Sequence, residues 1–159
     1  SEHTMHREPF VVTADFLRRL IAHQGKLVAV GTTSVRTLES LYYIGVNCIE
    51  KGYPHDVGQW DPYIRSYGYS LTEALNAIIS YMEAKGLDQL QAGTRIIIVP
   101  GYDFKIVDIL VTNFHQPQST LLLLISAFLK GEWKQVYDYA LGNDFRFLSY
   151  GDSSILFRE

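Results

Sequence analysis

The stretch from residue 96 to residue 128 constrains the fold more than any other part of the chain. It contains two short apolar runs, Ile96–Val99 and Ile106–Val111, which are rich in β-branched residues and are separated by Pro and Gly. Such runs are typical of buried strands. Because residues 101–103 make the link between them short, we expect the two strands to pair as an antiparallel hairpin.

A polar cluster, Thr112–Pro117, follows the second run and precedes a continuous apolar segment that Ser119 or Thr120 can cap as a helix. In α/β folds, polar groups between a buried strand and a helix N-terminus lie where ligands bind. Asn113 and His115 are therefore candidate site residues, and a neutral His can act as acid or base near pH 7. The alternative for His115 is a structural role in ordering this loop, and periodicity alone favours that alternative.

The remaining segments alternate in the same way between short apolar runs and amphipathic helices. We expect strands or extended segments at Pro9–Val12, Leu27–Val30, Phe145–Ser149 and Ile155–Phe157, and helices at Ala14–His23, Val35–Ile44, Leu71–Lys85 and Glu132–Leu141. Thr13 can cap the first helix, and Ser70 with Glu73 forms a capping box at the third. This order predicts an α/β fold, a mixed sheet flanked by helices, in a single domain over residues 1–159.

A turn of small and hydroxyl residues, Gly31-Thr32-Thr33-Ser34, joins an expected buried strand to the helix that begins near Val35. This arrangement presents backbone N–H groups to an anion. In the simpler interpretation one hydroxyl merely caps the helix, and for an isolated turn that interpretation is favoured. Arg36 and Glu39 lie three residues apart on the helix and can form an ion pair.

Two charged residues have alternative interpretations. Asp108 interrupts an apolar run, so it lies on an exposed strand face or is buried with a partner, because burying an unpaired carboxylate is costly. Burial would make it a functional candidate. Arg146 lies on the polar side of its expected strand, where it is a solvated charge or, in a cleft, a clamp for phosphate or carboxylate.

An irregular insertion around residues 43–70 is rich in Tyr and Trp. A loop of this length inside a compact domain is usually functional or mobile. It contains the pair His55-Asp56, which has no third ligand at a fixed spacing. We therefore interpret this pair as surface and expect no metal site.

Composition limits the class of protein. The net charge of −3 gives no global attraction to nucleic acid, so such a partner would need a local basic patch. The single cysteine, Cys48, excludes an internal disulfide. The longest apolar stretch is too short to span a bilayer and no signal peptide is visible, so we expect a cytoplasmic protein. Because Walker-type, G-x-G-x-x-G and HExxH motifs are missing, the residues alone do not give the reaction.

Short segments spread along the chain carry a more specific signal. They are Met5–Glu8, Val30–Glu39, Pro100–Tyr102, Phe104–Asp108, Val111–His115, Pro117, Ser119–Leu122, Ser126–Phe128 and Phe145–Asp152. In this order they resemble the S-adenosylmethionine:tRNA ribosyltransferase-isomerase family of queuosine biosynthesis. The resemblance covers nearly all of the chain except Tyr43–Ala92.

The resemblance implies an activity. Family members transfer the ribosyl moiety of S-adenosylmethionine to the aminomethyl-deazaguanine base of tRNA and isomerise it to epoxyqueuosine, releasing adenine and methionine. S-adenosylmethionine is then a ribosyl-donating substrate, and no metal or membrane is implied. Family members are longer and carry a β-barrel domain, so this chain resembles their carboxyl-terminal part. We expect it to need the missing amino-terminal portion for activity.

The resemblance also suggests roles for individual residues. His115 or Asp108 would remove the proton next to the sulfonium. Substrate binding would involve Gly31, Thr32, Thr33, Ser34, Arg36, Tyr102, Lys105, Asn113, Arg146 and Tyr150. The cationic residues among them would hold a carboxylate or tRNA phosphates, and the tyrosines would stack on a base. A different class of function stays open, a non-catalytic tRNA- or nucleotide-binding module that keeps the fold.

Overall fold

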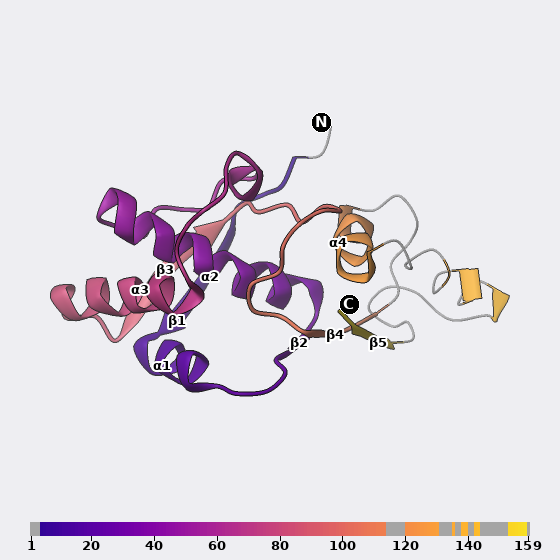
Figure 1. The fold of residues 1–159 in the computed structure, drawn as a ribbon, viewed down its shortest axis with the longest axis horizontal. Helices are drawn as coiled ribbons and strands as arrows, with labels where there is room; N and C mark the ends of the chain where they lie inside the picture. Colours follow the sequence, from indigo (N-terminus) through magenta and orange to yellow (C-terminus); the bar gives the residue numbers. More distant parts are fainter. Residues whose placement is uncertain are drawn as a thin grey trace. The chain divides into compact units, whose positions relative to one another are not determined.

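The computed structural model describes residues 4–113, 120–130, 135, 138–139, 142–143 and 153–158 (Figure 1). These residues group into two compact units. One comprises Ser1–Gly25 and Arg36–Ile96, and the other comprises Lys26–Val35 and Ile97–Glu159. Strands and helices are interspersed along the described chain, and one of its two sheets is mixed, which confirms the predicted α/β class. That residues 1–159 form a single domain stays a prediction.

The first unit is built on an antiparallel pair of strands. β1 (Glu8–Thr13) pairs with β3 (Gln89–Thr94). Thr13 ends β1 and caps α1 (Ala14–Ala22), accepting a hydrogen bond from the N–H of Phe16 at 3.0 Å, as predicted. The capping box of Ser70 and Glu73 begins α3 (Leu71–Lys85), and Gly86 ends it in the left-handed conformation. Local capping signals therefore fix where these two helices begin.

α2 (Thr32–Lys51) is longer than the predicted helix, which ended at Ile44. The prediction stopped too early because Gly45 resembles a helix stop. Gly45 instead lies inside the helix, where an added Cβ would be 2.2 Å from the carbonyl oxygen of Ala74 in α3. Glycine is thus required by the close approach of two helices, and the start of the expected irregular insertion is helical.

Residues 52–70 are irregular, with one short 3-10 helix at Asp61–Tyr63. Hydrogen bonds tie this loop to α2. The Tyr42 hydroxyl donates to the carbonyl of Tyr69 at 2.7 Å, and the Asn47 amide donates to the carbonyl of His55 at 2.8 Å. Its backbone polar groups are partly satisfied by these side chains, so the loop is attached to the unit at several points.

The second unit contains a three-stranded sheet in the order β2-β4-β5, formed by β2 (Val28–Val30), β4 (Ile109–Asn113) and β5 (Ser153–Phe157). β4 pairs parallel with β2 and antiparallel with β5, so the sheet is mixed, as predicted. β5 includes the predicted strand at residues 155–157. The sequence predicted that the strand at Leu27–Val30 is buried, and this is wrong. β2 is an edge strand of the sheet, and only Ala29 in it is buried.

The predicted hairpin of residues 96–99 with residues 106–111 is wrong. Ile96, Ile97 and Ile98 are almost fully buried, but they form no strand. β4 begins only at Ile109 and takes its partners from distant parts of the chain. The apolar pattern predicted the burial of these residues correctly. It did not predict the strand pairing, because pairing depends on distant partners that the local pattern does not identify.

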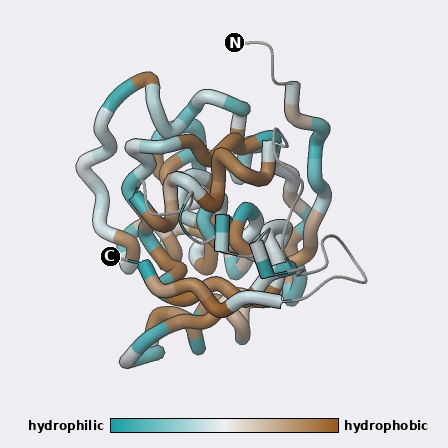
Figure 2. Tube along the Cα trace, turned by 90° about the vertical axis from the view of Figure 1, so that its right-hand side faces the viewer, coloured by the Kyte–Doolittle hydropathy of each residue, from teal (hydrophilic) through white to brown (hydrophobic). Residues whose placement is uncertain are grey.

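α4 (Thr120–Leu129) follows the predicted site loop, and six of its residues are buried. Figure 2 displays the apolar stretches of the described chain in brown, alternating with hydrophilic segments in teal. Ser119, the other predicted cap, lies outside the described residues. The predicted strand at 145–149 also lies there, as does most of the predicted helix at 132–141.

The contact at Gly45 gives a test of the helix packing. Alanine at position 45 should destabilise the protein by about 1–3 kcal/mol, because its methyl group collides with backbone atoms of α3. Without that collision the same change inside a helix stabilises by roughly 1 kcal/mol, so the sign of the change is decisive. Urea unfolding measures it.

Gly68→Ala is the matched control, since nothing lies within 4 Å of its added Cβ. We expect its free energy of unfolding to change by no more than about 0.5 kcal/mol. A stabilising Gly45→Ala would contradict the close packing of α2 on α3.

Candidate functional site

A pocket of about 470 Å³ lies in the second unit at the carboxyl ends of the parallel strands β2 and β4. Its walls come from the end of β2, the first turn of α2, the end of β4, and the starts of α4 and β5. The residues that line it are Val30, Gly31, Thr32, Thr33, Ser34, Val111, Thr112, Asn113, Leu121 and Ser153. This is the edge of an α/β sheet at which ligands usually bind.

The turn at Gly31 fixes the start of α2 against the sheet. Gly31 has φ +89°, a conformation that side chains disfavour, and its N–H donates to the carbonyl of Val111 at 2.7 Å. The first bond of the helix runs from the N–H of Val35 to the carbonyl of Gly31 at 3.3 Å. In the described part of the chain, the N–H groups of residues 32–34 have no acceptor. This end of a 20-residue helix carries partial positive charge.

Asn113 and the hydroxyl residues add side-chain donors and acceptors to the pocket. The Ser153 hydroxyl donates to Oδ1 of Asn113 at 2.8 Å, across the antiparallel pairing of β4 with β5. Thr33 and Ser34 are exposed, while Thr32 is 7% exposed. The structure therefore places five of the predicted binding residues in one pocket, the residues of the Gly31–Ser34 turn together with Asn113.

Arg36 follows the Gly31–Ser34 turn by two residues but does not line the first pocket. It belongs to the first unit, is 8% exposed, and donates from Nε to the carbonyl of Ile96 at 3.0 Å. Burial lowers the pKa of its guanidinium, while the charge of Glu8 acts in the opposite direction. Its Nη2 is buried and has no hydrogen-bond partner among the residues that the structure describes. A buried donor of this kind is rare and costly, so it is a candidate for contact with an absent group.

Asp108 lies at the other end of β4, just before the strand begins. Its Oδ2 accepts a hydrogen bond from the N–H of Leu27 at 3.0 Å, and its Oδ1 pairs with Nη2 of Arg158 at 2.9 Å. The sequence allowed an exposed carboxylate or a buried one with a partner. In the structure Asp108 has the partner and its side chain is half-buried. Asn113 lies five residues after Asp108, at the far end of β4, which is a span of about 17 Å. Asp108 is therefore not brought together with Asn113.

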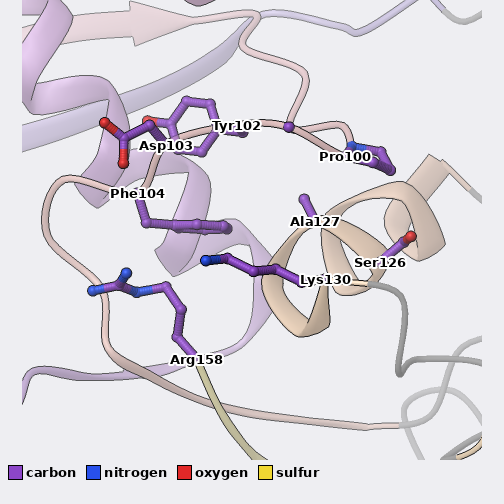
Figure 3. A pocket seen from close by; sticks show the side chains of 9 residues that line it. Pro100, Tyr102, Asp103, Phe104, Ser126, Ala127, Lys130 and Arg158 are labelled. Carbon is purple, nitrogen blue, oxygen red and sulfur yellow. The ribbon is translucent and has the colours of Figure 1, made fainter.

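A second pocket, of about 410 Å³, lies at the end of α4 (Figure 3). Tyr102 and Phe104 form part of its wall and pack edge to face, with ring centroids 5.0 Å apart. Lys105 pairs with Asp103 at 3.0 Å. Lys130 and Arg158 also line this pocket. Neither was predicted from the sequence, because each follows an apolar element and belongs to no motif. Ser153, the first residue of β5, also belongs to none of the motifs that the sequence shows.

Three predicted site residues, His115, Arg146 and Tyr150, lie outside the described residues. Within the described ranges no group of three or more His, Cys, Asp or Glu side chains can hold a metal ion. No helix in the described part is long and apolar enough to cross a membrane. Burial raises the pKa of the Cys48 thiol to about 11, which keeps it protonated and weakly reactive.

Comparison with known proteins gives a consistent family. The family profile described as "Queuosine biosynthesis protein" matches residues 1–156. The chain is 39% identical over 162 residues to the S-adenosylmethionine:tRNA ribosyltransferase-isomerase of Chelativorans sp. (strain BNC1), and 37% identical over 163 residues to that of Rhodopseudomonas palustris (strain BisB5). These alignments cover 99% and 100% of this chain, and 34% of each relative.

A solved structure agrees. The S-adenosylmethionine tRNA ribosyltransferase of Thermotoga maritima matches with a TM-score of 0.61 and 28% identity, over 92% of this chain and 40% of that protein. The chain thus spans about a third of the length of the curated relatives it matches. From the family profile, which matches nearly every residue, and from these relatives, we conclude that the chain belongs to the queuosine biosynthesis protein family.

Proposed function

We propose that this chain is the carboxyl-terminal part of a cytoplasmic S-adenosylmethionine:tRNA ribosyltransferase-isomerase. The full enzyme transfers the ribosyl moiety of S-adenosylmethionine to the aminomethyl-deazaguanine base of tRNA, forms epoxyqueuosine, and releases adenine and methionine. The observation that carries the proposal is the pocket at the start of α2, which combines helix N–H groups, hydroxyls and Asn113 in a chain of this family.

The first turn of α2 suits the carboxylate of the methionyl part of S-adenosylmethionine. Its N–H groups have no acceptor among the described residues, and the helix end favours a negative charge. The hydroxyls of Thr33 and Ser34 supply two further donors. The volume of the pocket, about 470 Å³, is within the usual range for sites that bind small molecules.

Of the two candidate bases, His115 suits proton removal better. Both carboxylate oxygens of Asp108 already accept hydrogen bonds, and one of them is paired with a guanidinium. Both oxygens of this carboxylate are therefore already occupied by partners within the protein. His115 follows Asn113 by two residues, and Asn113 lines the pocket.

The other predicted binding residues would contact a substrate anion, the tRNA backbone or a base. Arg36 has a buried donor, Nη2, that we propose to bind an anionic group of the substrate. Lys105 and Arg146 remain our candidates for contact with the tRNA backbone, and Tyr150 for stacking on a base. Tyr102 is only 6% exposed, so its part in the proposed stacking is limited to the edge that reaches the second pocket.

The extent of the relatives favours a dependence on further polypeptide. Because the chain spans about a third of their length, we propose that it supplies part of the active site and is inactive alone. A non-catalytic binding module of the same fold is the alternative. Both accounts predict binding of RNA or S-adenosylmethionine, but only the first predicts turnover after the rest of the protein is present.

Ribosyl transfer from ribose-labelled S-adenosylmethionine to tRNA carrying the aminomethyl-deazaguanine base tests the proposal directly. The 159-residue chain and a polypeptide completed to the length of its relatives are assayed together. We expect label in the tRNA only with the completed polypeptide. Absence of label from both would favour the binding module.

The choice of base is tested by two variants of the completed polypeptide. His115→Ala should lower the single-turnover rate of ribosyl transfer by about two orders of magnitude or more, because general-base catalysis is lost. Asp108→Asn should mainly lower the melting temperature, since it weakens the pairing with Arg158 that holds the sheet together. If Asp108→Asn removes the chemical step at unchanged stability, Asp108 is the base.

The role of the first turn of α2 is tested by Thr33→Val, which removes a hydroxyl at constant size. We expect the Kd for S-adenosylmethionine to rise about tenfold to a hundredfold, because a hydrogen bond to a charged group contributes about 1.5–3 kcal/mol. The melting temperature should hardly change, because Thr33 is exposed.

Thr72→Val is the matched control. Thr72 is an exposed threonine at the second position of α3, just as Thr33 is at the second position of α2. Equal effects of the two substitutions on binding would show that the carboxylate does not contact this turn.

A further inference from the structure

The second pocket contains a cationic side chain that the proposed reaction does not use. Lys130 follows the last residue of α4 and is exposed, and it has no ion-pair partner among the described residues. In Figure 3 its ammonium group and the guanidinium of Arg158 lie below the ring of Phe104, in the same hollow. The pocket thus joins cationic groups from two elements to an aromatic wall.

The backbone of Lys130 is unusual. Lys130 has φ +50°, and among the described residues it is the one non-glycine residue with positive φ. Glycine or asparagine is the usual residue at such a position after a helix, because a long side chain is strained there. A strained residue that presents a charge to a pocket is a reasonable sign of function.

The charges around the pocket favour an anion. Asp103 is paired with Lys105, and Asp108 is paired with Arg158, at 3.0 Å and 2.9 Å. These two pairs are neutral overall, so Lys130 leaves the group with one positive charge. The sulfonium of S-adenosylmethionine is itself cationic and gains nothing here, whereas an RNA phosphate is attracted.

The apolar part of the wall favours more than a bare phosphate. Pro100, Tyr102, Phe104 and Ala127 line the pocket, and the guanidinium carbon of Arg158 lies 6.0 Å from the centroid of the Phe104 ring. Sites for single-stranded RNA combine cationic groups for the backbone with apolar and aromatic surface for the nucleotide.

The position of the pocket fits a substrate that extends beyond the reaction site. α4 has Leu121 at the first pocket and Lys130 just after its other end. A helix of ten residues spans about 15 Å, which corresponds to four or five phosphates along one strand of a duplex. A small molecule bound at the first pocket does not extend this far, but an RNA strand does.

We propose that the pocket formed by Tyr102, Phe104, Lys130 and Arg158 binds one nucleotide of the tRNA strand flanking the modified base. Lys130 and Arg158 contact its phosphate, and the apolar wall contacts its ribose or base. This inference rests on the proposed function for the identity of the RNA, but the binding itself does not require ribosyl transfer.

Binding of a fluorescein-labelled single-stranded uridine hexanucleotide to the 159-residue chain, measured by anisotropy over a range of salt concentrations, tests the pocket. Lys130→Asn removes the charge with a residue that tolerates positive φ. We expect its Kd to rise about fivefold and the slope of log K against log salt to become shallower by about 0.7, the value for one contact with a single strand. Its melting temperature should be unchanged or higher, because asparagine suits this backbone.

Lys130→Arg and Lys85→Gln are the controls. Arginine retains the charge and should retain binding. Lys85 is an exposed lysine at the end of α3, so Lys85→Gln makes the same change in net charge in the other unit. If Lys130→Asn and Lys85→Gln have the same Kd and the same salt slope, the pocket does not bind RNA.

Competition identifies the ligand. Uridine 5′-monophosphate should displace the labelled RNA at lower concentration than inorganic phosphate, and S-adenosylmethionine should not displace it. Equal competition by inorganic phosphate would overturn the nucleotide assignment, and competition by S-adenosylmethionine would assign the pocket to the donor.

The inference and the proposed function fail separately. Lys130-dependent RNA binding without ribosyl transfer by the completed polypeptide would retain the pocket and reject the reaction. Ribosyl transfer with RNA binding insensitive to Lys130→Asn would do the reverse.

Discussion

The position of Asp108 is the constraint on which the three-stranded sheet depends. Its N–H donates to the carbonyl of Leu27 at 3.0 Å while its Oδ2 accepts from the N–H of the same residue, so the start of β2 is held from two directions. On the other side, the N–H of Arg158 donates to the carbonyl of Asp108 at 3.1 Å, and its guanidinium pairs with the carboxylate. One residue thus links β2, β4 and β5, because its backbone and side chain together satisfy both neighbours.

This register also determines what meets at the far end of β4. Once Ala29 is opposite Leu110, Gly31 reaches the carbonyl of Val111, and α2 must start beside the end of the strand. On the antiparallel side, the same register places Ser153 opposite Asn113. The first pocket is therefore a consequence of the register set near Asp108, about 17 Å from Asn113, and a slip of one residue would exchange the two faces of the strand.

The pocket at the start of α2 and the pocket at the end of α4 differ in charge and in wall chemistry. The one at the start of α2 offers backbone N–H groups and hydroxyls, which suit a small carboxylate without the need for a charged side chain. The one at the end of α4 offers Lys130 and Arg158 beside aromatic rings, which suit a nucleotide. The two pockets lie at opposite ends of α4. In the proposed enzyme the ribosyl donor and the flanking nucleotide are therefore bound by different residues.

The sequence by itself determined the local features of this protein. Hydroxyl caps at Thr13 and Ser70, apolar periodicity and the Gly31–Ser34 turn predicted α1, α3 and the start of the first pocket, because their causes lie within a few residues of each other. Only the tertiary structure decided which strands pair, why Gly45 lies inside a helix, where Asp108 finds its partners, and that Lys130 meets Arg158. The physical reason is that backbone hydrogen bonds between strands and close contacts between helices join residues far apart in the chain, and an apolar run shows that it will be buried without showing against what.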